Sequence, residues 1–284
     1  MEKLHLTVAV TDALAGRTVE SLLRRQLQLP AGFVSHLKFV PGGITLNGRP
    51  VRVTVRVREG DVLAARIDDV GAGNPFPPAD CGVRVLWEDE YAAVVSKPAG
   101  VTVHGPGASV ASFAALHWGA ERGFHPVNRL DRGTTGLMCL AGCGLAHDRL
   151  RRALHTERFV REYLAAAQGV CPARGTADGA VGGRPARTDY ERLWTDGEYT
   201  LLRLRLFTGR THQIREHMAA LGHPLAGDTA YGGGGTLARP ALHSARCEFD
   251  HPFGRGRLSF SEPLPEDMCV FLAQRGCPAP LFEI

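Results

Sequence analysis

Hydrophobic positions near the start of the chain recur at helical spacing. Between residues 17 and 27 they lie about one helical turn apart and predict a helix, whose hydrophobic face would consist of Val19, Leu22, Leu23 and Leu27. A second short helix is predicted over residues 33–39. The chain is therefore expected to begin with a small αα-hairpin.

Two strands are predicted after these helices. Ile44 to Gly48 has the pattern of a strand that enters a tight turn, because Asn47 and Gly48 adopt the positive φ angles that a hairpin needs. In residues 51–58 a valine occupies every second position, between Arg or Thr residues, which predicts a strand with its valines facing inward.

Charge is distributed unevenly in this first part of the chain. Residues 17–58 contain eight basic residues and one acidic residue, Glu20. Such an asymmetry predicts an RNA-binding surface. The candidate RNA-binding residues here are Arg24, Arg25, Lys38, Arg52, Arg56 and Arg58. A charged sheet edge that discourages aggregation is the alternative interpretation.

A stretch rich in Gly and Pro, residues 68–82, predicts a linker between a domain at 1–67 and a second domain at 83–284. In the second domain, strands are predicted over residues 83–86, 92–96, 137–141, 159–165, 188–194 and 199–207. Helices are predicted over residues 109–120, 145–154 and the stretch after 212, and residues 173–185 are expected to form a Gly-rich surface loop. Strands and helices in this order indicate an α+β fold.

Candidate chemistry is concentrated between His125 and Ala141. Asp131 lies there between two cations, Arg129 and Arg132, and is followed by a Gly-bracketed turn and a hydrophobic run. This order would hold Asp131 at the rim of a buried strand, where functional side chains are often found. A turn-capping role for Asp131 is the alternative.

The amino-acid composition, net charge and cysteine count indicate what kind of protein this is and where it is expected to work. The 284 residues are 44% hydrophobic and 22% charged, which suits a globular protein with a sizeable core. The net charge is +4, and 30 of the 33 basic residues are Arg, which binds phosphate well; genome base composition could produce the same bias. Seven cysteines without framework spacing indicate a reducing cytoplasm, and no signal peptide or membrane span is expected.

Several motifs resemble those of RluA-type pseudouridine synthases. Residues 128–136 (NRLDRGTTG) resemble the His-Arg-Leu-Asp-x-x-Thr-Ser-Gly signature, from which Asn128 and Thr135 depart. Residues 97–100 (KPAG) are similar to a segment ahead of the catalytic loop, and residues 161–165 (REYLA) to a Lys-x-Tyr-x-Ala element with Arg161 in place of Lys. Residues 208–215 (TGRTHQIR) closely resemble a fourth element, Thr-Gly-Arg-x-His-Gln-Ile-Arg. The likeness spans about residues 83–272 in the same order.

This resemblance implies a synthase domain with a mixed, mostly antiparallel sheet flanked by helices. Residues 10–67 resemble an RNA-binding domain first seen in a small-subunit ribosomal protein. The implied catalytic residues are Asp131, Tyr163 and Arg215, and the implied substrate-binding residues are Arg129, Arg210, Ile214 and Arg132. Arg152 joins the RNA-binding set. Asp131 could attack the ribose or remove one of its protons, and the sequence leaves both routes open.

The expected enzyme is a cytoplasmic monomer that uses no metal and no nucleotide or other cofactor, and its expected substrate is ribosomal RNA in preference to tRNA. A catalytically silent RNA-binding or ribosome-assembly factor and a tRNA synthase are the alternatives. A zinc enzyme is disfavoured, because Cys139, Cys143 and His147 lie near one another without a recognised zinc spacing. The synthase hypothesis requires Asp131 and Arg215 to lie together beside a cavity.

Overall fold

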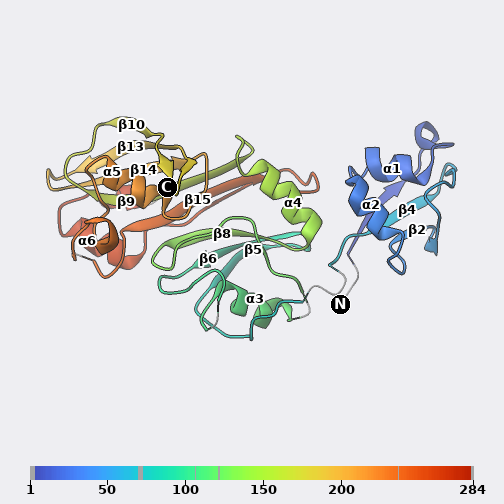
Figure 1. The fold of residues 1–284 in the computed structure, drawn as a ribbon, viewed down its shortest axis with the longest axis horizontal. Coiled ribbons are helices and arrows are strands. Elements are labelled where there is room, and N and C mark those ends of the chain that lie inside the picture. Colours follow the sequence, from blue (N-terminus) through green and yellow to red (C-terminus); the bar gives the residue numbers. More distant parts are fainter. Residues whose placement is uncertain (1–3, 70–72, 106, 121, 236, 283–284) are drawn as a thin grey trace. The chain divides into compact units, whose positions relative to one another are not determined.

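The computed structural model describes residues 4–69, 73–105, 107–120, 122–235 and 237–282. The chain divides into two compact units, Met1–Val70 and Gly71–Ile284. We describe each unit by itself (Figure 1).

The first unit contains two helices and a four-stranded sheet. The helices are α1 (Val19–Arg25) and α2 (Ala31–Leu37), preceded by a short 3-10 helix, η1 (Asp12–Leu14). The strands are β1 (His5–Ala9), β2 (Ile44–Leu46), β3 (Arg49–Pro50) and β4 (Val62–Arg66), in the order β1-β4-β2-β3. Leu22 and Leu23 of α1 and Leu63 of β4 are fully buried in its core. Both predicted helices and the Asn47-Gly48 turn, with φ angles of 51° and 76°, are confirmed.

The strand predicted over residues 51–58 is wrong. This segment contains no strand and only an isolated bridge between Thr18 and Arg56. Its carbonyl groups instead accept hydrogen bonds from the start of α1: Val55 O from the Val19 N–H and Val53 O from the Glu20 N–H, both at 2.9 Å. The segment thus satisfies the free N–H groups of a helix. The next sheet strand is β4.

Most of the predicted linker packs on the larger unit. The Asn74 side chain is buried and donates a hydrogen bond to Ala111 O at 2.7 Å, and the Ala79 N–H donates to Ser112 O at 3.1 Å. The boundary between the units falls within the predicted linker, of which residues 70–72 lie outside the described residues. The Gly- and Pro-rich composition predicted a linker, and residues 74 and 79 of this stretch make hydrogen bonds to the larger unit.

The larger unit is built on a ten-stranded mixed sheet (Figure 1). Its path is β10-β13-β14-β9-β15-β8-β6-β5, with β16 paired to β15 and β7 paired to β8. The strands are β5 (Arg84–Glu88), β6 (Ala92–Lys97), β7 (His125–Pro126), β8 (Thr135–Ala141), β9 (Phe159–Gln168), β10 (Arg174–Ala177), β13 (Thr188–Thr195), β14 (Tyr199–Leu206), β15 (Leu242–Asp250) and β16 (Arg257–Ser261). Pairing is antiparallel except between β15 and β8, so the α+β class with a mixed sheet is confirmed.

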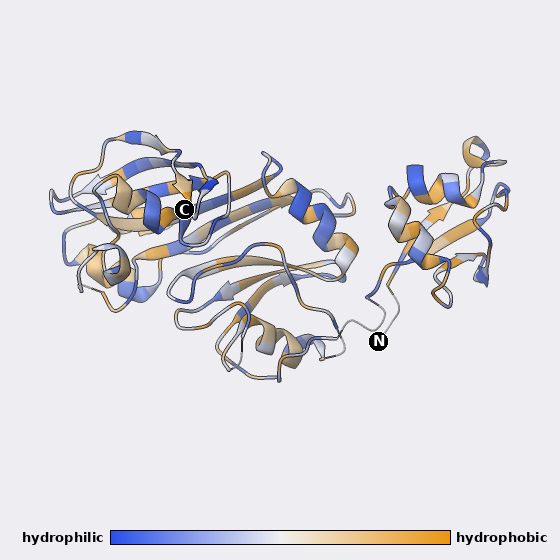
Figure 2. Cartoon of the chain, viewed as in Figure 1, coloured by the Kyte–Doolittle hydropathy of each residue, from blue (hydrophilic) through white to orange (hydrophobic). Residues whose placement is uncertain are grey.

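Helices cover both faces of this sheet. They are α3 (Val110–Trp118), α4 (Gly144–Ala153), α5 (Gln213–Ala220) and α6 (Glu266–Ala273), with 3-10 helices η2 (Thr229–Tyr231) and η3 (Ala279–Phe282). Alternate residues of β9 enter different clusters: Tyr163 packs with residues of α3 and α5, and Leu164 packs with residues of α6. Figure 2 shows the contrast between hydrophobic central strands and hydrophilic positions on α4. Among the described residues, no helix is long and apolar enough to cross a membrane.

One glycine allows two strands of the large sheet, β8 and β15, to approach closely beside the loop that contains Asp131. Gly136 lies in β8 with a φ of 107°, and a Cβ atom at this position would stand 2.2 Å from Ser244 O of β15. Only a residue without a side chain fits there. The close approach of β8 to β15 therefore fixes where the loop before β8 ends.

The loop expected over residues 173–185 contains regular structure. It holds β10, which extends the large sheet, and the two-residue strands β11 (Ala180–Val181) and β12 (Arg184–Pro185), which pair with each other. Its glycines indicated an irregular loop, but Gly182 and Gly183, with φ angles of 56° and 72°, form the turn of this small hairpin. The prediction of a loop was wrong for these strands.

Candidate active site

The loop between β7 and β8 presents Asp131 at the edge of the buried sheet. The hydrogen bonds that hold its backbone include those from the Thr134 N–H to Asp131 O at 3.1 Å and from the Gly100 N–H to Arg132 O at 2.8 Å. The Asp131 side chain remains 24% exposed, although every residue of β8 is buried. A rigid strand thus holds an accessible carboxylate.

Arg215, in the first turn of α5, is the ion-pair partner of Asp131. Its Nη1 lies 3.6 Å from Asp131 Oδ2, which is a charge contact beyond hydrogen-bond distance. The same guanidinium makes a bidentate pair with Asp228, at 2.6 Å from Nε and 2.7 Å from Nη2. Asp228 raises the pKa of Arg215, chiefly through these hydrogen bonds. Asp131 and Arg215 therefore lie together in the structure. Asp228, which was not predicted from the sequence, is a further partner of Arg215.

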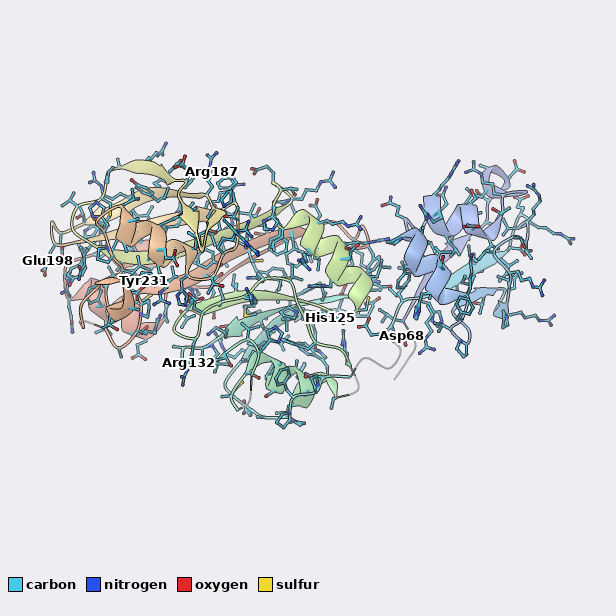
Figure 3. The ribbon with its side chains drawn as sticks, in the orientation of Figure 1. Asp68, His125, Arg132, Arg187, Glu198 and Tyr231 are labelled. Atoms are coloured by element: carbon cyan, nitrogen blue, oxygen red, sulfur yellow. The ribbon has the colours of Figure 1, made fainter. Side chains whose placement is uncertain are left out.

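A strained histidine and a tyrosine complete this side of the site. His212 precedes α5 with a φ of 58°, a conformation that is uncommon for a residue other than glycine. Its Nε2 lies 3.9 Å from Asp131 Oδ1, and its Nδ1 lies 3.1 Å from the Tyr231 hydroxyl. The centroid of the Tyr231 ring, which is labelled in Figure 3, lies 5.0 Å from the Arg215 guanidinium carbon, so the ring makes a cation–π contact with that side chain.

Two adjoining cavities meet at Asp131. The larger one has a volume of about 680 Å³, and the smaller one has a volume of about 50 Å³. Both are lined by Arg129, Leu130, Asp131, Tyr163, Leu206 and Arg210. Arg215 and Ile214 line the smaller cavity, whereas Arg161 and Arg151 line the larger one. The larger volume falls in the range of small-molecule sites and is ample for one nucleoside.

Tyr163 is placed by the register of the central strands. It lies on β9 opposite Leu204 of β14 and Ser244 of β15, and it is only 4% exposed. Burial raises the pKa of Tyr163. Its hydroxyl is therefore protonated near neutral pH, and its ring forms part of the wall of both cavities.

The four predicted substrate-binding residues separate into two groups. Arg129 and Arg210 line both cavities, and Ile214 is buried against the smaller one. Arg132 is exposed and lines neither cavity; its Nε donates a hydrogen bond to Gly100 O at 3.0 Å (Figure 3). The side chains of Arg129 and Arg132, three residues apart, therefore have different surroundings.

Lys97, at the end of β6, supports the loop from behind. Its side chain is fully buried, and Nζ donates hydrogen bonds to Pro98 O at 2.8 Å, Val101 O at 2.9 Å and Arg132 O at 3.4 Å. Burial lowers the pKa of Lys97 to about 8. The sequence likened residues 97–100 to a family segment, and the structure shows that the buried Lys97 ammonium ties this segment to the residue after Asp131.

The two departures from the family signature both have polar partners. Asn128 is buried, and its Oδ1 accepts a hydrogen bond from the Cys139 N–H at 2.8 Å. Thr135 Oγ1 lies 2.8 Å from His243 Nδ1. Burial lowers the pKa of His243 to about 4, so this ring is neutral at physiological pH. Thr135 therefore has a side-chain partner, whereas the Nδ2 group of Asn128 is buried without a hydrogen-bond partner among the described residues.

The predicted RNA-binding cations are exposed, with differences among them. Arg24, Arg25, Lys38, Arg52, Arg56 and Arg58 are all exposed on the first unit. Arg56 Nη1 donates a hydrogen bond to Gly16 O at 2.6 Å. Arg152 on α4 pairs with Asp148 at 2.9 Å, whereas its neighbour Arg151 lines the larger cavity.

The residues weighed as a zinc site are placed differently from zinc ligands. Cys139 is buried in β8 and Cys143 is buried at the N-cap of α4, while His147 lies within that helix and lines the larger cavity. Within the described ranges, no three His, Cys, Asp or Glu side chains are grouped to hold a metal ion. None of the seven cysteines, all of which the structure describes, forms a disulfide.

Two residues of the site were missed from the sequence. Asp228 lies within residues 83–272, the span that resembles the family, but nothing in its local pattern indicated that it holds Arg215. Arg161 was noted only as a replacement for Lys, and it is a buried arginine in the wall of the larger cavity. Two observations could have drawn attention to it: it is charged within a buried strand, and it lies two residues before Tyr163.

Comparison with known proteins identifies the family. The family of RNA pseudouridylate synthases matches residues 91–220. An uncharacterized RNA pseudouridine synthase of Bacillus subtilis, YjbO, is 33% identical over 266 residues, covering 86% of this chain and 94% of that protein. The ribosomal large subunit pseudouridine synthase D of Vibrio parahaemolyticus is 34% identical over 310 residues, covering 94% and 93% of the two chains. The chain therefore belongs to the RNA pseudouridine synthase family, and it is an enzyme of that class.

A solved structure agrees in fold. The human RNA pseudouridylate synthase domain containing 4 protein superposes with a TM-score of 0.58 at 23% identity, covering 68% of this chain and 93% of that one. The match supports the α+β architecture of the larger unit.

Proposed function

We propose that this enzyme converts a specific uridine of ribosomal RNA to pseudouridine, with Asp131 as the catalytic carboxylate. The observation that carries the proposal is the accessible Asp131 carboxylate, 3.6 Å from Arg215 at the junction of two cavities. The proposed isomerisation uses Asp131 as the nucleophile or the base, and Arg215 lies within charge-contact distance of it. Ribosomal RNA is favoured because a relative that matches most of this chain is named for the ribosomal large subunit.

The remaining site residues have distinct proposed roles. The target uridine must leave its stacked position, which costs a few kcal/mol. Arg129 fills the vacated space, and the buried Tyr163 ring packs on the extruded base. Ile214 supplies an apolar contact from α5. Arg210 contacts phosphate or serves as a second partner for Asp131, and Arg132, outside the cavities, contacts the RNA backbone.

The first unit is proposed to bind RNA. Residues 17–58 of this unit contain eight basic residues and one acidic residue, Glu20. Within the described residues, none of these eight basic side chains forms an ion pair with a carboxylate. Unpaired, exposed cations are suited to phosphate contacts that weaken as salt rises. Arg152 of the larger unit is proposed to add a further, weaker contact.

We also propose a cytoplasmic monomer. Seven cysteines, none of which forms a disulfide among the described residues, suit a reducing compartment. No cofactor is proposed, because the isomerisation is balanced in atoms and electrons and can proceed with acid–base and nucleophilic side chains alone.

The test is a pseudouridine map of total RNA from cells with and without this protein. We expect one or more pseudouridines of large-subunit ribosomal RNA to disappear, and to return when the wild-type protein is supplied. Loss of pseudouridine from tRNA alone would show that the substrate is tRNA and not ribosomal RNA. An unchanged map in every RNA would refute the proposed function.

A further inference from the structure

Arg161 is buried in the wall of the larger cavity and has no counter-ion. The residue is 3% exposed, and within the described part of the chain it forms no ion pair with a carboxylate. Its hydrogen bonds all come from Nη2 and go to neutral carbonyl groups, Leu154 O at 3.2 Å, Leu206 O at 3.5 Å and Thr208 O at 3.3 Å. Its Nε is buried with no partner among the described residues. Burying a cation in this way is costly unless an anion joins it.

The surroundings of Arg161 leave room for that anion. Arg161 and Tyr163 are two residues apart on β9, so their side chains project from the same face of the strand. Both line the larger cavity together with Asp131. Gly209 lies beside the guanidinium: a Cβ atom at residue 209 would stand 3.0 Å from Nη1. Glycine at this position keeps the space next to Nη1 free.

The reaction generates an anion in this cavity. When the bond from ribose C1′ to uracil N1 breaks, both bonding electrons go to N1. If Asp131 attacks, a bond from its carboxylate to C1′ forms as uracil leaves. If Asp131 removes the C2′ proton, a C1′–C2′ double bond forms instead. In both cases uracil departs as an anion with its charge spread over N1 and the carbonyl oxygens, before C5 bonds to C1′.

We propose that Arg161 is a catalytic residue that stabilises the uracil anion and retains it in the cavity while the base turns. This inference rests on the proposed function. Arg215 is less suited to the role, because its donors are already directed at Asp228 and Asp131. Fixed cations that face developing charge in a water-poor site stabilise a transition state strongly.

A backbone phosphate is the other anion that Arg161 could meet. Arg129 and Arg151 line the same cavity and are exposed, so they can contact phosphates that remain in water. Arg161 lies deep beside Tyr163, the proposed platform for the base. The burial of Arg161 therefore favours the base over the phosphate.

The experiment compares two leaving groups in one RNA. A fragment of ribosomal RNA containing the mapped uridine is prepared with uridine or with 5-fluorouridine at that position, and bond cleavage is followed in single turnovers. Fluorine makes the departing anion a weaker base that needs less stabilisation. We expect Arg161→Met to slow uridine cleavage by about 10²- to 10³-fold and to slow 5-fluorouridine cleavage far less. Arg161→Lys, which keeps a cation, should lie between Arg161→Met and the wild type.

The outcomes separate this inference from its alternatives. Arg151→Met is the matched control, since it removes an exposed cation of the same cavity and should lower RNA affinity without a leaving-group effect. Equal slowing of both substrates by Arg161→Met, or a loss of affinity alone, would refute the anion role. If Arg161→Met does not fold, the Arg161→Lys comparison decides. A wild-type enzyme that modifies no RNA would instead refute the proposed function.

Discussion

The two cavities that meet at Asp131 differ in the partners of their buried arginines: carboxylates neutralise one, and only carbonyl groups bind the other. In the smaller cavity, Arg215 is bound by Asp228 and paired with Asp131, and its pKa is raised. In the larger cavity, Arg161 has only carbonyl partners for Nη2, and burial lowers its pKa. Both side chains are at least nine-tenths buried, so solvent exposure does not explain the difference.

This difference separates two tasks within one site. A cation that is already neutralised can hold a carboxylate in place before substrate arrives, because its position does not depend on the ligand. A cation without a counter-ion is disfavoured in the free enzyme and gains when an anion forms beside it. Under the proposed mechanism, Arg215 in the smaller cavity would hold the Asp131 carboxylate, and Arg161 in the larger cavity would bind the departing base.

Asp131→Asn removes the carboxylate that both cavities share, and it should have the largest effect. Because asparagine can neither attack the ribose nor take its proton, we expect single-turnover pseudouridine formation to fall by on the order of 10⁴-fold or more. RNA affinity, measured by filter binding, should change less than about threefold. Equal loss of activity and affinity would instead show that Asp131 holds the loop in shape.

Asp228→Asn tests whether the buried Arg215 cation needs the Asp228 carboxylate as its counter-ion. Breaking a buried ion pair by removing one partner typically costs about 3–5 kcal/mol, and we expect the free energy of unfolding in urea to fall by that amount. Activity should also fall, because Arg215 loses the partner that orients it. Asp148→Asn is the control: its pair with Arg152 is exposed and should be worth about 0.5 kcal/mol or less. Equal losses in the two variants would contradict the comparison.

The sequence predicted the candidate catalytic residues that meet in the structure, but it did not predict the residues that hold them in place. Asp131, Tyr163 and Arg215 lie in short motifs whose order along the chain is distinctive, and the structure brings them to one place. Asp228 carries no such local signal, since its role depends on how the chain returns to α5. Arg161 was visible as a charge in a buried strand, but its lack of a counter-ion depends on tertiary structure.

The errors in the fold have a similar origin. The alternation in residues 51–58 is as regular as in any strand, and it failed because the N–H groups of Val19 and Glu20 use carbonyls of that segment. The glycines of residues 173–185 indicated irregular structure, although two of them form a hairpin turn. Periodicity reports which face of a segment is apolar; it does not report which partner its backbone will find.

Lys97 offers a pH test of the support behind Asp131. Its pKa is about 8 in the folded protein, against 10.5 ordinarily, so the unfolded chain binds more protons between these values. The free energy of unfolding should therefore rise with pH across this window, by up to about 3 kcal/mol from this group, and the contribution is lost as the pH falls through 8. Urea unfolding at pH 7 and pH 10 measures it. The rise should be smaller by that amount in Lys97→Met, and an identical rise in both proteins would contradict the assignment.

Arg151 and Arg152 give the smallest effect and the finest comparison. They are adjacent on α4 and both exposed, but Arg151 lines the larger cavity, whereas Arg152 pairs with Asp148. A cation that meets a phosphate releases about one counter-ion, so Arg151→Gln should weaken RNA binding several-fold and lower the salt dependence by about one unit in the log–log slope. Arg152→Gln should change both less, because Asp148 already neutralises that charge. Salt titrations of RNA affinity distinguish the two, and a larger effect at Arg152 would place the RNA path outside the larger cavity.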